Sequence, residues 1–233
     1  MARRPRITPG GLPYHVLNRS AGKFKMLRKD PDFEAFERIM AEAVERHPIR
    51  ILAWCILSTH WHFVVWPTGD DEVTNFFRWL THTHAMRWRV SRRTVGYGHL
   101  YQGRFKSFPI QSDDHCLTVC RYVERNALSA GLVKRAEDWR WGSLWARTHE
   151  SSAQHALLTN GPVPLPSDWV KHVNAPITKK ERLLFEESLH RGRPLGSEAW
   201  VAKTVKKLGL EHTIRSEGRP KKDRNGDAAS FGN

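Results

Sequence analysis

The sequence is poor in cysteine and has no hydrophobic run of membrane-spanning length. Its three cysteines are too few and odd in number for a disulfide framework, and we interpret Cys116 and Cys120 as buried apolar residues. No apolar segment approaches the roughly 20 residues that cross a bilayer, and no apolar segment typical of a signal peptide follows the basic N-terminus. We therefore expect a cytoplasmic protein that does not interact with a membrane.

Acidic residues are absent from residues 73–112, although this stretch contains seven lysines and arginines. A solvated surface normally mixes charges of both signs, so the stretch favours a polyanion-binding surface over a solvated basic face or one that binds anionic lipid. The whole chain has a formal net charge of +14, which indicates nucleic acid as the polyanion. The candidate contacts in this stretch are Arg78, Arg87, Arg89, Arg92, Arg93, Arg104 and Lys106.

The hydrophobic pattern predicts a β-α-β-β-α-β order followed by a further helix. Asp30 and Pro31 are typical of a helix start, and Ser112 to Asp114 are typical of another. This order predicts an α+β fold of the ferredoxin-like split βαβ type, an antiparallel sheet with helices on one face. The other face would then be open to carry a site. The expected strands are 14–18, 49–57, 60–66 and 104–111, and the expected helices are 30–47, 74–93 and 112–130.

Composition divides the chain into five regions. We expect a basic N-terminal arm over 1–11, a main domain over 12–147, a Pro-rich linker over 148–176, a basic helical DNA-binding extension over 177–217 and a disordered basic tail over 218–233. The extension would contain two short helices, because Thr178 and Glu181 form a capping-box pattern and Gly196-Ser197 precedes a second apolar stripe.

Two histidines two residues apart, His60 and His62, lie in the third expected strand. Side chains alternate along a strand, so both imidazoles point to the same face. Two neutral imidazoles on one face are half of a metal site, and two hydrogen-bonded core histidines are the equally weighted alternative. His15, which faces away from its neighbour Tyr14 on the first strand, is interpreted as a hydrogen-bonded sheet histidine.

Tyr122 and Asn126 lie on the flank of the last helix of the main domain, beside its apolar stripe. They are four residues apart, so both side chains can face one point in space. A tyrosine hydroxyl beside an amide oxygen suits a nucleophile next to a metal ligand. His60, His62 and Asn126 would form a nitrogen and oxygen site for Mg²⁺ or Mn²⁺, and Tyr122 would attack a DNA phosphate to give a phosphotyrosine.

These residues resemble a known family. His60-Trp61-His62 resembles the HUH motif, and the segment from Arg121 through Asn126 to Val133 is similar to the tyrosine segment of REP-associated tyrosine transposases. The resemblance implies a ferredoxin-like nuclease domain that acts on single-stranded DNA. The substrates of the family are short palindromic repeats that fold into hairpins, and cleavage leaves a 5′-phosphotyrosine and a free 3′-OH.

Further candidate DNA contacts lie in the C-terminal half. The segment at Arg193 resembles the C-terminal extension of the family, and Arg219 and Lys221 belong to a Gly-Arg-Pro-Lys-Lys segment that resembles an AT-hook core. Arg121, next to the tyrosine, completes the set. The expected partner is hairpin-forming single-stranded DNA, bound by a monomer or homodimer associated with the nucleoid.

Two alternatives to a metal-dependent transposase stay open. The chain could be a non-catalytic DNA-hairpin-binding protein derived from such an enzyme, with a purely structural histidine pair. It could also be a zinc-dependent nuclease or zinc-stabilised domain that recruits Cys116 or Cys120 as a thiolate ligand.

Overall fold

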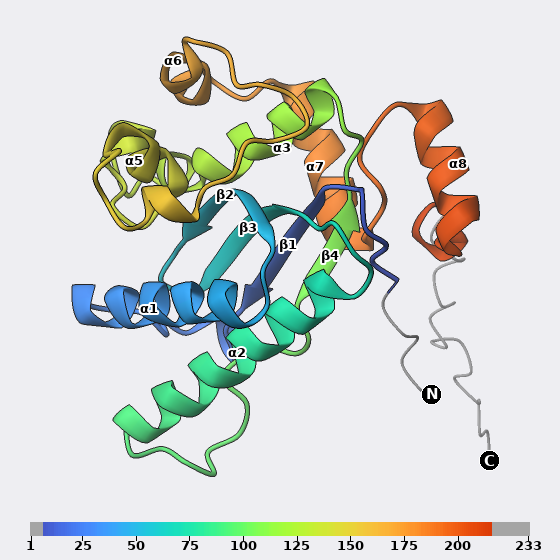
Figure 1. Cartoon of the computed structure of the whole chain (residues 1–233). Helices are drawn as coiled ribbons and strands as arrows, with labels where there is room; N and C mark the ends of the chain where they lie inside the picture. Colours follow the sequence, from blue (N-terminus) through green and yellow to red (C-terminus); the bar gives the residue numbers. More distant parts are fainter. Residues whose placement is uncertain (1–6, 216–233) are drawn as a thin grey trace, which may run out of the picture.

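The computed structural model describes residues 7–215, and it contains one four-stranded antiparallel sheet in the order β2-β3-β1-β4 (Figure 1). This strand order, with a helix after β1 and another after β3, confirms the predicted α+β fold. The strands are β1 (Tyr14–Arg19), β2 (Arg50–Ile56), β3 (His60–Trp66) and β4 (Lys106–Pro109). The helices are α1 (Asp30–Arg46), α2 (Glu72–Ser91), α3 (Asp114–Glu124), α4 (Asn126–Ser129), α5 (Ser143–Thr148), α6 (Trp169–Asn174), α7 (Lys179–Arg191) and α8 (Glu198–Leu208).

Local capping signals place several helix starts. Thr178 and Glu181 form the expected capping box of α7, and the Ser197 hydroxyl accepts the backbone N–H of Trp200 at the start of α8. The N-cap of helix α1 lies one residue before the expected Asp30. Its N-cap is Lys29, and the capping carboxylate is that of Asp32, which accepts the backbone N–H of Lys29 at 3.3 Å.

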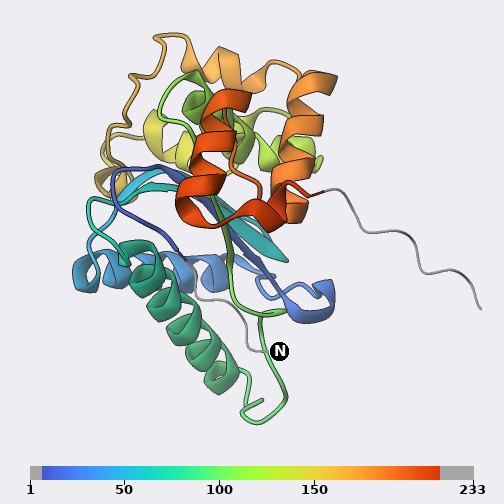
Figure 2. The same ribbon diagram turned by 90° about the vertical axis from the view of Figure 1, so that its right-hand side faces the viewer.

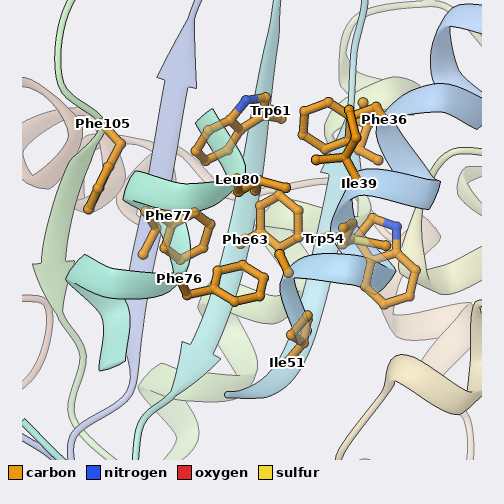
Figure 3. Close-up of a cluster of buried hydrophobic side chains, with 14 of the residues drawn as sticks. Phe36, Ile39, Ile51, Trp54, Trp61, Phe63, Phe76, Phe77, Leu80 and Phe105 are labelled. Atoms are coloured by element: carbon orange, nitrogen blue, oxygen red, sulfur yellow. The ribbon is translucent and has the colours of Figure 1, made fainter. Parts of the chain in front are cut away.

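One face of the sheet packs against α1 and α2 through large apolar side chains. Trp61 and Phe63 point to this face from β3, and Phe36 of α1 and Phe77 of α2 pack against them (Figure 3). The indole of Trp61 stacks on the ring of Phe77, with 5.5 Å between the ring centroids. Since side chains alternate along β3, this packing turns His60 and His62 to the opposite face.

The opposite face is also covered, so the expectation of helices on one face is wrong. Cys55, Val64 and Phe108 form a second core with Val119 and Val123 of α3. Figure 2 shows α1 and α2 below the sheet and the C-terminal helices above it. The reason is that β2 is buried on both faces from Ile51 onward, so its second face also needs an apolar cover.

Residues 148–176 are not the expected linker, because they pack against the main domain. Trp169 and Val173 of α6 are buried in the second core. Their burial removes large apolar side chains from water, which holds the segment in place. The following extension docks as well: Leu195 exchanges backbone hydrogen bonds with Pro109 and Gln111 at the edge of β4, at 3.0 and 2.9 Å.

Within residues 7–215, no helix is both long enough and apolar enough to span a membrane.

A buried histidine in the first core makes the fold sensitive to acid. Burial lowers the pKa of His84 to about 3, and its Nδ1 lies 2.6 Å from the hydroxyl of Tyr101. The folded state therefore keeps His84 neutral, whereas the unfolded chain protonates it below its ordinary pKa of 6.5. The stability due to this histidine is complete above that pH and falls as the pH drops toward 3.

We predict that unfolding free energy decreases by about 1.4 kcal/mol per pH unit below pH 6.5 through His84 alone. Urea denaturation between pH 7 and pH 4 measures it: His84→Phe should flatten the slope by this amount, and His82→Phe, at an exposed position on the same helix, should not. Equal slopes for His84→Phe and the unmodified chain would contradict the prediction.

Candidate active site

Each of the two histidines of β3 has a different hydrogen-bond partner at its Nδ1 atom. His60 Nδ1 lies 2.8 Å from the Thr59 hydroxyl, and His62 Nδ1 lies 3.0 Å from Nε2 of His15. Antiparallel pairing with β1 sets Arg19 opposite His60 and Leu17 opposite His62. Among residues 7–215, Nε2 of both histidines therefore has no protein partner, the pattern of a metal-ligating histidine.

Tyr122 lies against His62 of this pair, and Asn126 lines the same groove as these residues. The Tyr122 ring lies 6.0 Å from the His62 ring in an edge-to-face arrangement and stacks on Phe185 of α7 at 4.2 Å, centroid to centroid. Asn126 begins α4 directly after α3 ends, and its amide nitrogen donates weakly to the Tyr122 backbone carbonyl at 3.4 Å. The amide oxygen of Asn126 therefore remains available for another group.

These residues line a groove of about 1070 Å³. Its walls come from the end of β1, the start of β3, the segment that enters β4, helix α3 with Tyr122, the start of α4 and α7. The polar and charged lining residues are Asn18, Arg19, Lys23, Thr59, His60, His62, Gln102, Arg104, Lys106, Tyr122, Asn126, Glu186 and His190.

Burial keeps the reactive groups of the groove uncharged at neutral pH. Burial lowers the pKa of His60, with a smaller contribution from the Arg19 charge, and it lowers the pKa of His62 well below the ordinary value, with help from His15 and His60. Burial also raises the pKa of Tyr122, and the side-chain amide of Asn126 acts on the phenol in the opposite direction. The site therefore presents neutral imidazoles, which can donate a lone pair, beside a neutral phenol.

The sequence profile of the family described as "Transposase IS200 like" matches residues 10–126, half of the chain, and includes β1, the histidine pair, Tyr122 and Asn126. The chain belongs to this IS200-like transposase family.

Two solved structures are similar to the IS200-like chain. The first, described as a REP-associated tyrosine transposase bound to a REP hairpin, is 18% identical with a TM-score of 0.51, and the match covers 77% of this chain and 99% of that one. The second, a transposase from Deinococcus radiodurans R1, is 14% identical with a TM-score of 0.37, over 53% and 96% of the two chains. At this identity the first match supports the fold. A comparison with curated proteins finds no match.

Of the sequence-predicted DNA contacts, Arg104 and Lys106 are the ones that the structure brings to the groove. The α2 residues lie on the helix that packs against the other sheet face, and two of them pair with α1: Arg87 with Glu42 and Arg92 with Asp32. Arg89 donates to the Gly98 carbonyl, whereas Arg78 and Arg93 lie on or just beyond α2 away from the groove lining.

Arg193 pairs with Glu187 of α7 and is not among the residues that line the groove. Arg219 and Lys221 lie outside the described residues.

The prediction of a DNA contact is wrong for Arg121, whose side chain is buried and fully engaged. Its guanidinium donates to the backbone carbonyls of His172, Ala175 and Pro176, each at 2.8 Å, and pairs with Glu181 at 2.6 Å. An arginine next to Tyr122 looks the same in a sequence whether it binds phosphate or backbone carbonyls. In this fold Arg121 joins α3 to α6 and α7.

A buried carboxylate, that of Glu124, also fixes this last turn of α3. Glu124 accepts hydrogen bonds from Ser143 and Trp169, each at 2.6 Å, and from Arg147 at 2.9 Å. These contacts join α3 to α5 and α6. Tyr122 lies between Arg121 and Glu124 in the sequence, so both ties restrain the orientation of the turn that carries it.

The structure does not assemble the zinc alternative among residues 7–215. Cys116 and Cys120 are buried in the second core, and the described residues contain no group of three histidine, cysteine, aspartate or glutamate side chains placed to hold a metal ion. Hydrogen bonding to Cys116 and burial raise the pKa of Cys120 well above its ordinary value, which disfavours the thiolate that zinc requires. A metal in this groove would need Asn126 as its third ligand.

Among the lining residues with ionisable side chains, sequence reasoning missed four: Arg19, Lys23, Glu186 and His190. Arg19 could have been found, because antiparallel pairing of the first and third strands sets it opposite His60. No local signal marks Glu186 or His190, since they reach the groove through long-range packing of α7.

Removal of the Arg121 side chain should destabilise the protein strongly, because it leaves three carbonyls and the carboxylate of Glu181 without their partner. For Arg121→Ala we predict a loss of about 3–5 kcal/mol in unfolding free energy, measured by urea denaturation. Arg38→Ala, which removes an exposed cation from α1, should change it by less than about 0.5 kcal/mol. A near-zero effect of Arg121→Ala would mean that the buried contacts do not hold α3.

Proposed function

We propose that the chain cuts and rejoins single-stranded DNA, with Tyr122 as the nucleophile. The observation that carries the proposal is the arrangement at the groove. The tyrosine ring lies edge-on to His62, and Nε2 of both histidines has no hydrogen-bond partner within the described part of the chain. This arrangement is the one expected for phosphoryl transfer to an amino acid hydroxyl beside a metal site.

The donor set fits a divalent cation of the Mg²⁺ or Mn²⁺ type. His60 and His62 would offer Nε2, and Asn126 would offer its amide oxygen. The hydrogen-bond partner at Nδ1 of each imidazole, Thr59 for His60 and His15 for His62, would hold the ring in place. When bound, such an ion polarises a non-bridging phosphate oxygen and offsets the charge that develops during transfer.

In the proposed reaction the Tyr122 hydroxyl oxygen forms a bond to a backbone phosphorus of the DNA. The bond from that phosphorus to the 3′ oxygen of the preceding nucleotide breaks, which leaves a 5′-phosphotyrosine and a free 3′-OH. The phenolic proton leaves Tyr122 and the departing 3′ oxygen takes up a proton, so charge and atoms balance. The phosphodiester energy is kept in the covalent link, so the strand can be rejoined in the reverse direction.

The groove also suits the DNA backbone. Arg19, Lys23, Arg104 and Lys106 lie along its walls, with Glu186 as the carboxylate among them. Cations at this spacing would neutralise several phosphates of one strand. The similar transposase was solved with a REP hairpin, which supports a hairpin with a single-stranded flank as the substrate of this chain as well.

Tyr122→Phe should abolish the covalent product and preserve binding. The probe is single-stranded repeat DNA from beside the encoding gene, incubated with Mn²⁺ and resolved under denaturing conditions. We expect the adduct to fall by more than about 1,000-fold, because no other group takes over the nucleophile's role. Tyr97→Phe, which removes an exposed hydroxyl from the loop after α2, is the matched control and should leave the adduct unchanged. Persistence of the adduct in Tyr122→Phe would exclude this nucleophile, and no adduct with the unmodified chain would favour a non-catalytic hairpin binder.

Lys106→Ala should weaken binding of the same DNA in a salt-dependent way. Lys106 is exposed and lines the groove, so we expect the slope of log affinity against log salt concentration to decrease by about 1. Fluorescence anisotropy at several salt concentrations measures this slope. Arg38→Ala, on the far face of the sheet, should keep the original slope, and an unchanged slope for Lys106→Ala would place the DNA outside the groove.

A further inference from the structure

His15, the second residue of β1, lies beside His62 and has no exposed surface. The two imidazole rings stack with 5.1 Å between their centroids and 15° between their planes. His15 Nε2 lies 3.0 Å from His62 Nδ1, which is hydrogen-bond distance. His15 also contacts Phe108 of β4 and Tyr122 of α3 through its ring edges or faces. It therefore connects the sheet to the histidine pair without reaching the groove lining itself.

A hydrogen bond between two imidazole nitrogens requires a proton on one of them and a lone pair on the other. If His62 Nδ1 carries the proton, its Nε2 has a lone pair. If His15 Nε2 carries it, His62 Nδ1 accepts and His62 Nε2 holds the hydrogen of the neutral ring. Only the first arrangement allows His62 to bind a cation, so the direction of this hydrogen bond decides what His62 can do.

The second nitrogen of His15 makes the two arrangements unequal. His15 Nδ1 is buried and has no hydrogen-bond partner among the residues that the structure describes, 7–215. In the arrangement that frees the His62 lone pair, His15 Nδ1 must hold an unsatisfied N–H. In the reverse arrangement it holds an unsatisfied lone pair, which proteins tolerate somewhat more often.

We propose that His15 is a positioning residue: when a divalent cation takes the Nε2 lone pair of His62, His15 accepts the Nδ1–H of His62 and holds its ring in the orientation that binds the cation. The inference rests on the proposed function, because it concerns the same groove and the same cation. It adds that the cation site depends on a residue that cannot touch the cation. It also predicts that cation binding selects one direction of the His15–His62 hydrogen bond.

Mn²⁺ binding without DNA tests the role of His15, measured by isothermal titration and by the electron paramagnetic resonance signal of free Mn²⁺. His15→Phe keeps a ring against Phe108 and Tyr122 and removes the acceptor. We expect it to weaken Mn²⁺ binding by about 10- to 100-fold, as loss of an outer partner of a metal ligand does. His15→Gln, whose amide oxygen can accept the same hydrogen, should recover part of the affinity.

Phe108→Leu is the matched control, because it perturbs the packing around His15 and keeps the acceptor. It should bind Mn²⁺ like the unmodified chain. Equal affinities of His15→Phe and the unmodified chain would overturn the inference and leave the proposed function standing. If the unmodified chain binds no Mn²⁺, the metal dependence in the proposed function fails, and the inference fails with it.

A second measurement needs no substitution at His15, in case His15→Phe does not fold. Long-range ¹H–¹⁵N correlation spectra report which nitrogen of each imidazole carries the proton. Addition of Mg²⁺ to the unmodified chain should give His62 a protonated Nδ1 and an unprotonated Nε2. A protonated His62 Nε2 at saturating Mg²⁺ would overturn the inference.

Discussion

The buried polar contacts of the last turn of α3 are the constraint on which the candidate site depends. Arg121 donates to three backbone carbonyls and pairs with Glu181. Glu124 accepts hydrogen bonds from Ser143, Arg147 and Trp169. Removing one partner of a buried charge is strongly destabilising. These contacts therefore resist any tilt of the turn. Tyr122 lies between them and takes its direction from both. The segment from α5 to α7 therefore holds the Tyr122 side chain toward the histidine pair.

The sheet supplies the second half of the site through simple alternation. On β3, Trp61 and Phe63 pack into the core against α1 and α2, and this packing turns His60 and His62 to the other side. A slip of one residue would exchange the two sets and bury the histidines under α2. The same alternation on β1 sends Tyr14 to one core and His15 to the histidine pair. Core packing thus fixes the positions of the candidate metal ligands, and hydrogen bonds to Thr59 and His15 fix their rings.

The sequence was sufficient to predict features that depend on local patterns. The order of elements, the Thr178 and Ser197 caps, the shared face of the histidines and the flank shared by Tyr122 and Asn126 all follow from spacing along the chain. Features that depend on long-range packing were missed. Nothing local shows that Arg121 faces carbonyls 50 residues away rather than phosphate, that residues 148–176 bury Trp169, or that α7 stacks Phe185 on the tyrosine. The charge pattern alone also overstated the role of α2 in DNA binding. Arg87 and Arg92 form ion pairs with carboxylates on α1, which lies outside the acid-free stretch.

The central claim is that Tyr122 takes the phosphate, and the most direct measurement is to locate the covalent link. After reaction with the repeat DNA and Mn²⁺, nuclease and trypsin digestion followed by mass spectrometry would identify the modified peptide. Trypsin cleaves after Arg121 and Arg125, so the tyrosine is released in the short peptide of residues 122–125. The account predicts a nucleotide joined through phosphate to that peptide. A nucleotide found on any other peptide, with residues 122–125 recovered unmodified, would contradict it.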